Sequence, residues 1–113
     1  MGGAGTTAEE KTMRTREMRL SDYGILRSDE EKLEELIKNI DPENKKILVE
    51  CAKSCAPGIE MAVVQNLTGK RMGYRTINKQ SEIPVGEDDF YGYSRKTLAM
   101  FWRQLKLLGR WEE

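Results

Sequence analysis

The side chains best suited to chemistry are two cysteines. Cys51 and Cys55 stand four residues apart in a segment with helical periodicity, so both thiols should lie on one face of a helix. A zinc site would need further cysteine or histidine ligands, but the chain contains no histidine and no second cysteine pair. We therefore expect plain buried thiols, with no metal and no cofactor.

Catalytic acids and bases are equally hard to assign. Without histidine, the common pairs of nucleophile and imidazole base are absent. Pairs of carboxylates remain an option, but the dense acids of "SDEEKLEE", residues 28–35, fall on the solvent side of an amphipathic helix. The stretch "NLTGKR", residues 66–71, lacks the earlier glycine and the Ser or Thr of a phosphate-binding loop. The sequence predicts a protein that is not an enzyme.

Charge is balanced over the whole chain but not along it. Nineteen bases match nineteen acids, yet residues 28–69 carry a net charge of −4 and residues 70–113 a net charge of +3. This basic excess is too small to drive tight phosphate binding alone. If the protein binds DNA, the side chains expected to contact phosphate are Lys70, Arg71, Arg75, Lys79, Arg95, Lys96 and Arg103.

The length of 113 residues suits one domain. No apolar run is long enough to cross a membrane, and no signal peptide is evident, so we expect a cytoplasmic protein without membrane contact.

Capping signals and apolar periodicity divide this domain into helices. Ser28 with Glu31 has the spacing of a capping box, Asp41 precedes a proline that suits the first turn of a helix, and Gly109 follows the last apolar repeat. The expected helices cover 29–40, 42–56, 59–68, 72–81 and 87–108. The predicted fold is all-α: a compact domain of about five helices over residues 28–113, with a long terminal helix. A flexible tail is expected over residues 1–27, in which residues 8–20 could form a short helix.

The last two expected helices and the turn between them have the spacing of apolar residues that is typical of a helix–turn–helix unit. In that motif the second helix lies in the major groove of DNA and the first crosses the backbone. The apolar anchors of the unit are Tyr74, Ile77, Ile83, Val85, Phe90 and Tyr91.

The first turn of the second helix is acidic, with Glu87, Asp88 and Asp89 after Gly86. Acids there interact favourably with the positive end of the helix dipole, and each stabilises the helix by roughly 0.3–1 kcal/mol. They also occupy the place where a recognition helix meets phosphate, and acids read little beyond the amino group of cytosine. Either the basic residues named above contact DNA, or the domain docks to a protein.

This segment resembles small helix–turn–helix proteins of phages and prophages of Gram-positive bacteria, which often end in a pattern like "Y…I…IPxxxxxFYxxRRK". The matching residues are Tyr74, Ile77, Ile83, Pro84, Phe90, Tyr91, Arg95 and Lys96, and "DYGI" at residues 22–25 is similar to their N-terminal part. The resemblance implies a helical domain with a regulatory DNA-binding role and no catalytic set. The chain departs from the pattern at residues 86–89, where Ser, Arg or Lys is common, and in an Arg-rich patch reduced to Arg95-Lys96.

The last helix also carries an apolar seam at alternating spacings of three and four, formed by Tyr91, Ser94, Leu98, Phe101, Leu105 and Leu108. The seam could fold back on helices 29–40 and 42–56 or pair with a second copy. We favour a homodimer, with a dimer or partner interface at Leu98, Phe101, Trp102, Leu105, Leu108 and Trp111. The aromatic residues Tyr93, Trp102 and Trp111 either complete the core or form an exposed patch of the kind that anchors protein interfaces.

Two functions follow from these patterns. The first is a phage- or prophage-encoded regulator of transcription that binds DNA inside the bacterial host. The alternative is a phage-encoded interaction protein that binds and inhibits a host protein, for example a component of a defence system.

Overall fold

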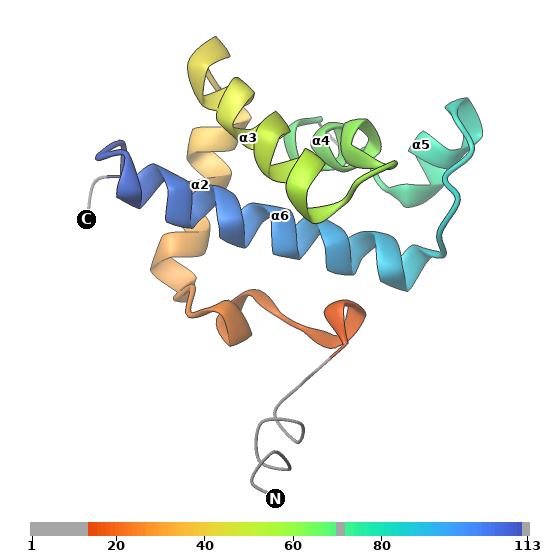
Figure 1. Ribbon diagram of the computed structural model, residues 1–113, viewed down its shortest axis with the longest axis horizontal. Helices are drawn as coiled ribbons and strands as arrows, with labels where there is room; N and C mark the ends of the chain where they lie inside the picture. The colour runs from red at the N-terminus through yellow and green to blue at the C-terminus, as the bar shows by residue number, and fades with distance from the viewer. Residues whose placement is uncertain (1–13, 70–71, 112–113) are drawn as a thin grey trace, which may run out of the picture.

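A computed structural model of the chain describes residues 14–69 and 72–111, and these ranges hold helices and connecting turns with no strand. Within the described ranges, two short 3-10 helices precede five α-helices (Figure 1). The elements are η1 (Thr15–Glu17), η2 (Leu20–Tyr23), α2 (Arg27–Lys38), α3 (Pro42–Cys55), α4 (Glu60–Thr68), α5 (Tyr74–Gln80) and α6 (Glu87–Leu107). The all-α fold and the long terminal helix predicted from the sequence are confirmed.

Most helix boundaries follow the capping chemistry of the sequence. Asp41 accepts a hydrogen bond from the N–H of Asn44 at 2.7 Å, and Pro42 takes the first position of α3. The start of α2 differs from the prediction. The carboxylate of Asp29 accepts a hydrogen bond from the N–H of Leu26 at 3.3 Å, so the helix begins two residues earlier than expected.

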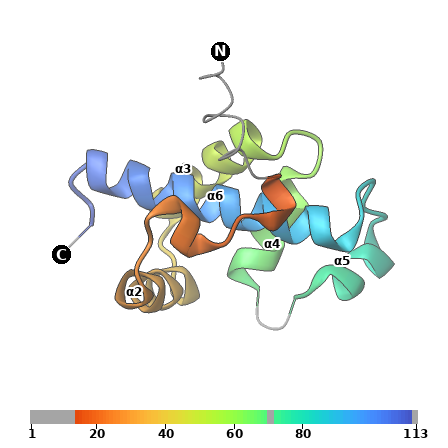
Figure 2. The same cartoon turned by 90° about the horizontal axis from the view of Figure 1, so that it is seen from below.

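The long helix α6 runs through the middle of the molecule (Figures 1 and 2). α3 and α4 lie along one side of α6, and the N-terminal segment with η1 and η2 lies along another. α5 sits at the N-terminal end of α6 (Figure 1). Because α3, α4 and the N-terminal segment pack against different sides of α6, its apolar side chains are buried on more than one side of the helix. The fully buried large side chains are Phe90, Phe101, Leu33, Leu48, Ile77, Leu105, Val63 and Val64.

The predicted interface seam therefore needs correction. Phe101 and Leu105 are fully buried, and Leu98 and Trp102 are 8% and 7% exposed, all inside the single chain. These four side chains have no surface to offer a second copy, because α3, α4 and the N-terminal segment already cover them. Of the predicted interface, Leu108 is exposed and Trp111 is half-buried.

The three aromatic residues left open by the sequence pack on the core. Trp102 belongs to the buried cluster, and Tyr93 and Trp111 pack against it while partly exposed. The ammonium group of Lys106 lies 4.2 Å from the centre of the Trp102 ring, which covers the ring's outer face. Completion of the core, rather than an exposed aromatic patch, describes these side chains.

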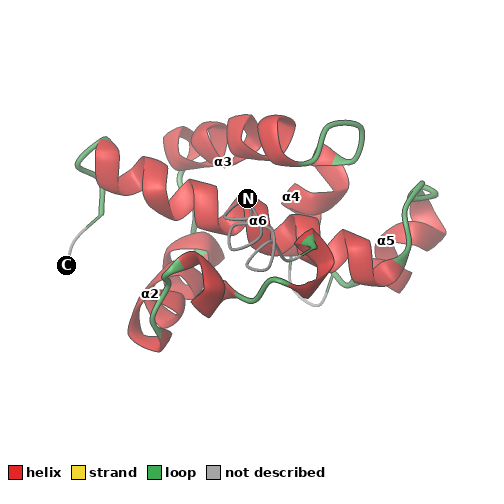
Figure 3. Ribbon diagram, turned by 60° about the horizontal axis from the view of Figure 1, so that its bottom comes forward, coloured by secondary structure: helices red, strands yellow, loops and turns green. Residues whose placement is uncertain are grey.

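The N-terminal segment, residues 14–26, is part of the domain rather than a tail. Ile25 is buried in the core, and η1 and η2 both contact α6 (Figure 3). The domain boundary expected at residue 28 therefore lies further toward the N-terminus. The helix expected over 8–20 falls partly outside the described residues. Its described part forms the 3-10 turn η1 followed by extended backbone at Met18, not an α-helix.

Candidate nucleic-acid interface

The two helices predicted to form a helix–turn–helix unit, α5 and α6, are joined by a turn at residues 81–86 and tied together by two tyrosines. The hydroxyl of Tyr91 accepts a hydrogen bond from the N–H of Tyr74 at 2.9 Å, which satisfies a donor at the start of α5. The hydroxyl of Tyr74 donates to the carbonyl of Val85 at 2.7 Å. The ring of Phe90 meets both tyrosine rings edge-on, with centroids 5.5 Å apart. These contacts tie the beginning of α5 to the beginning of α6.

The other end of α5 is fixed as well. The side-chain oxygen of Asn78 accepts a hydrogen bond from the N–H of Ile83 at 2.7 Å. Ile77 and Ile83 are both buried beneath this contact. The apolar anchors predicted for the unit thus pack as expected, and α5 is held at both ends.

The second helix of the unit is not placed like a free recognition helix. Its first turn, Glu87 to Asp89, is exposed and acidic. Beyond that turn, Gly92 and Ser94 are buried, and the N-terminal segment crosses the helix at Gly92. The part of α6 that would enter a DNA groove is therefore acidic or covered.

The predicted basic residues on α5 share one exposed face. Arg75 and Lys79 are one turn apart, both exposed, and neither has an ion pair within the described part of the chain. Lys70 and Arg71 lie outside the described residues. The stretch 61–81 contains these four bases and no acid. The outer face of α5 is consequently positive and polar.

The predicted basic residues on α6 differ in exposure. Arg95 is half-buried and donates from Nε to the carbonyl of Met18 at 2.6 Å and from Nη2 to the carbonyl of Arg16 at 3.0 Å. Its first role is to hold the N-terminal segment on α6. Lys96 and Arg103 are exposed. Helical rise places Arg103 about 12 Å further along α6 than Arg95.

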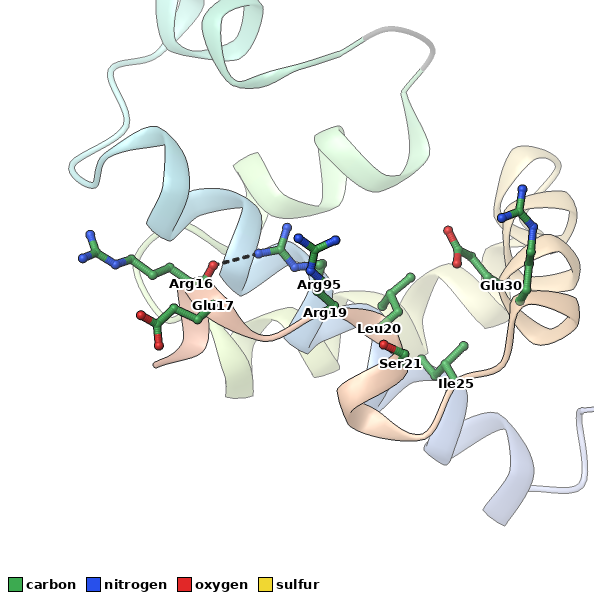
Figure 4. Close-up of a pocket in the computed structure, with 9 residues that line it drawn as sticks. Arg16, Glu17, Arg19, Leu20, Ser21, Ile25, Glu30 and Arg95 are labelled. Carbon is green, nitrogen blue, oxygen red and sulfur yellow. Dashed lines mark hydrogen bonds between the residues drawn. The ribbon is translucent and has the colours of Figure 1, made fainter. Parts of the chain in front are cut away.

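The structure adds arginines that the sequence reading missed. Arg16, Arg19 and Arg27 join Arg95 around a groove of about 800 Å³ beside the N-terminal segment (Figure 4). They were missed because residues 1–27 were expected to be a flexible tail. One signal was available: Gly92 interrupts the clearest helical pattern of the chain, and an isolated glycine in a helix often marks a close approach of another backbone.

No family model, curated protein or solved structure matches this chain. The resemblance to phage helix–turn–helix proteins stays a prediction, and function has to be inferred from surfaces and contacts. None of the helices within residues 14–69 and 72–111 combines the length and the apolar character needed to cross a bilayer.

The two thiols are buried, and they are not activated. Burial, with the neighbouring Cys55 thiol and Glu50 adding to it, raises the pKa of Cys51 to about 11. Burial likewise raises the pKa of Cys55, whose sulfur lies 3.6 Å from the sulfur of Met100. Thiols with raised pKa values remain protonated at neutral pH, so they are poor nucleophiles and poor metal ligands. Among the described residues, no three potential metal-ligating side chains come together.

Proposed function

We propose that the protein is a non-enzymatic, DNA-binding regulator of phage or prophage origin, and that it contacts the DNA backbone through the outer face of α5. The observation that carries this proposal is the exposed basic face formed by Arg75 and Lys79 on a helix fixed at both ends. Lys70 and Arg71 precede this face in the sequence. In helix–turn–helix proteins the first helix of the unit crosses the DNA backbone, and the proposal gives α5 this role.

Phosphate contacts of this kind give affinity that depends on salt and little on sequence. Glu87, Asp88 and Asp89 lie at the start of the next helix and oppose deep entry of α6 into a groove. The proposed binding mode is therefore backbone contact led by α5, with base reading left to few side chains.

The test measures binding of a labelled duplex of about 25 base pairs across a range of salt concentrations. The variant Arg75→Gln/Lys79→Gln removes two phosphate contacts, so the slope of log affinity against log salt should fall by roughly 2. The control Lys45→Gln/Lys46→Gln removes the same charge from exposed positions on α3 and should leave the slope unchanged. Absence of binding by the wild-type protein at low salt, or equal losses in both variants, would reject the proposal.

A second candidate function is binding of a host protein. Leu107 and Leu108 are 78% and 56% exposed at the end of α6. Leu108 also borders a mostly apolar groove of about 490 Å³ between α3 and α6, with Ile47 and Met100 among its lining residues. Adjacent exposed leucines beside an apolar groove are typical of protein-binding surfaces.

A pull-down from a Gram-positive host lysate, with and without nuclease, separates the two functions. Recovery of one stoichiometric host protein that survives nuclease and is lost in Leu107→Glu/Leu108→Glu would favour the interaction protein. Recovery that depends on nucleic acid and is lost in Arg75→Gln/Lys79→Gln would favour the regulator.

A further inference from the structure

The arginine groove lies on a different part of the molecule from the face of α5. Its walls come from the N-terminal segment, from the first turn of α2 and from α6 (Figure 4). Leu20, Ser21 and Ile25 also line it. The charged side chains around it are Arg16, Arg19, Arg27 and Arg95 together with Glu17 and Glu30. Four arginines and two glutamates thus line the groove, in a chain whose net charge is zero.

Arg95 is held in place before any ligand arrives. Its two hydrogen bonds to the carbonyl oxygens of Met18 and Arg16 fix the plane of the guanidinium group. Both N–H groups of Nη1 and one of Nη2 remain for a ligand. A guanidinium with a fixed plane loses little side-chain entropy when it binds, and its fork geometry matches two oxygens of a phosphate.

Arg19 supplies a second guanidinium beside Arg95. Its backbone is fixed because its N–H donates to the carboxylate of Asp22 at 2.7 Å. Figure 4 shows the side chains of Arg19 and Arg95 extending into the same region, while Arg16 extends away from them. The side chains of Arg16 and Arg19 have no carboxylate within ion-pair distance among the described residues.

The acids of the groove do not neutralise this pair. The carboxylate of Glu17 accepts a hydrogen bond from the N–H of Arg14 at 3.2 Å, at the start of the segment. Glu30 stands across the groove from Arg19 and Arg95 (Figure 4). Arg27 makes only a loose contact with Glu31, 3.9 Å between Nε and a carboxylate oxygen, with both side chains well exposed. Such surface pairs contribute little and exchange easily.

From this arrangement we propose that the groove binds phosphate groups, with Arg19 and Arg95 donating hydrogen bonds to one phosphate and Arg27 adding positive charge. The shared chemistry is a phosphate oxyanion, which both a nucleic-acid backbone and a free nucleotide carry. The inference does not depend on the function proposed for α5, because none of its residues belongs to that face.

The first experiment uses inorganic pyrophosphate as the probe and calorimetry at low salt as the measurement. The variant Arg19→Gln/Arg27→Gln changes only exposed side chains and leaves the contacts of Arg95 in place. Loss of charged hydrogen bonds should weaken pyrophosphate binding by roughly tenfold or more. The control Arg75→Gln/Lys79→Gln should bind pyrophosphate as the wild type does. Undetectable binding by the wild type, or equal binding by the groove variant, would overturn the proposal.

A second variant protects the test against a folding defect. Arg16→Gln alters the arginine that extends away from the centre of the groove, so it should reduce pyrophosphate affinity much less than Arg19→Gln. Equal losses from the two single variants would argue for diffuse attraction by positive charge and against a built site. Amide spectra of each variant verify that the segment still packs on α6.

Two further titrations identify the source of the phosphate. If the groove binds a nucleic-acid backbone, Arg19→Gln/Arg27→Gln should lower the salt slope for duplex DNA by about 1 to 2, and pyrophosphate should compete with DNA. If it binds a free nucleotide, ATP affinity should fall in that variant while DNA affinity stays unchanged. Loss of DNA binding in the α5 variant alone, with no pyrophosphate binding anywhere, would leave the function proposed for α5 standing and reject the groove.

Discussion

The backbone of Arg16 crosses α6 directly over Gly92. A side-chain carbon placed on Gly92 would lie 2.6 Å from the Cα of Arg16 and 2.7 Å from the carbonyl oxygen of Thr15, closer than such atoms can pack. Arg95, three residues later, donates hydrogen bonds to the carbonyl oxygens of Arg16 and Met18 in the same segment. Glycine inside a helix costs roughly 1 kcal/mol relative to alanine, so its presence here is best explained by the crossing.

We expect Gly92→Ala to loosen the N-terminal segment from α6. The added methyl meets backbone atoms of residues 15 and 16, which cannot move aside as a flexible side chain would. Overpacking of this kind typically destabilises a fold by roughly 1–3 kcal/mol. Urea denaturation should show the loss, and trypsin should cleave after Arg16 and Arg19 faster than in the wild type.

A double-mutant cycle with Arg95→Lys tests whether both residues act through the segment. Lysine keeps the positive charge but lacks the fork that reaches two carbonyl oxygens, so this variant should also loosen the segment. Once one substitution has released the segment, the other removes fewer remaining contacts. The double variant should therefore lose less free energy of unfolding than the sum of the two single losses. Strictly additive losses would mean that the residues act independently.

The helices could be predicted because their signals are local. Asp41 and Pro42 start α3, and Gly109, with a φ of 70°, follows the end of α6, all readable within a few residues. The seam of α6 is buried from Ser94 to Leu105, as its periodicity indicated, while Leu108 is exposed. Periodicity indicates which side chains are buried but not what buries them. Within one chain, α3, α4 and the N-terminal segment cover this side of α6, and the expected homodimer stays a prediction.

The arginine groove could not be predicted from local patterns. It depends on a contact between residues 16 and 92, which are far apart in the sequence. Their backbones can approach closely because Gly92 has no side chain. Residues 14–26 have no helical repeat, so no local pattern assigns them to a helix of the domain. Their order comes from tertiary contacts, chiefly those of Arg95 and Ile25.

Leu105 and Leu107 provide a test of which side of α6 is core. Leu105 is fully buried, while Leu107, two residues later on the same helix, is 78% exposed. Leu105→Ala should cost roughly 2–5 kcal/mol of unfolding free energy, and Leu107→Ala less than about 0.5 kcal/mol. Denaturation midpoints measured at several protein concentrations check the difference. If Leu105 lay in a dimer contact instead, the loss would depend on protein concentration.

The hydroxyl of Tyr91 should stabilise the junction of α5 and α6. Tyr91→Phe removes the acceptor for the N–H of Tyr74, leaving that partly buried donor without its partner. The expected loss is about 1 kcal/mol in urea denaturation, with the largest gain in amide exchange at Tyr74. Tyr93→Phe is the matched control: Tyr93 also packs on the core, but its hydroxyl makes no hydrogen bond within the described part of the chain. Equal losses in the two variants would show that the hydrogen bond contributes nothing.

The thiol of Cys51 should make the fold less stable at high pH. Burial raises its pKa from 9.0 to about 11, so the folded protein keeps a proton that the unfolded chain releases near pH 9. Between about pH 9 and pH 11 unfolding therefore releases a proton, and rising pH favours the unfolded chain. The stabilisation linked to the protonated thiol is fully present below pH 9 and is lost as the pH rises through 11. Urea midpoints measured at about pH 8 and about pH 10.5 should show the decline.

Cys51→Ala separates this thiol from the other groups that titrate in the same range. The variant should be less stable than the wild type near neutral pH, because it leaves a small gap in the core. Its further loss between about pH 8 and about pH 10.5 should be smaller, since residue 51 no longer carries a proton. Cys55 and Tyr23, whose pKa values burial also raises, remain in the variant and account for the residual decline. A decline as steep as that of the wild type would show that Cys51 ionises no later in the folded protein than in the unfolded chain.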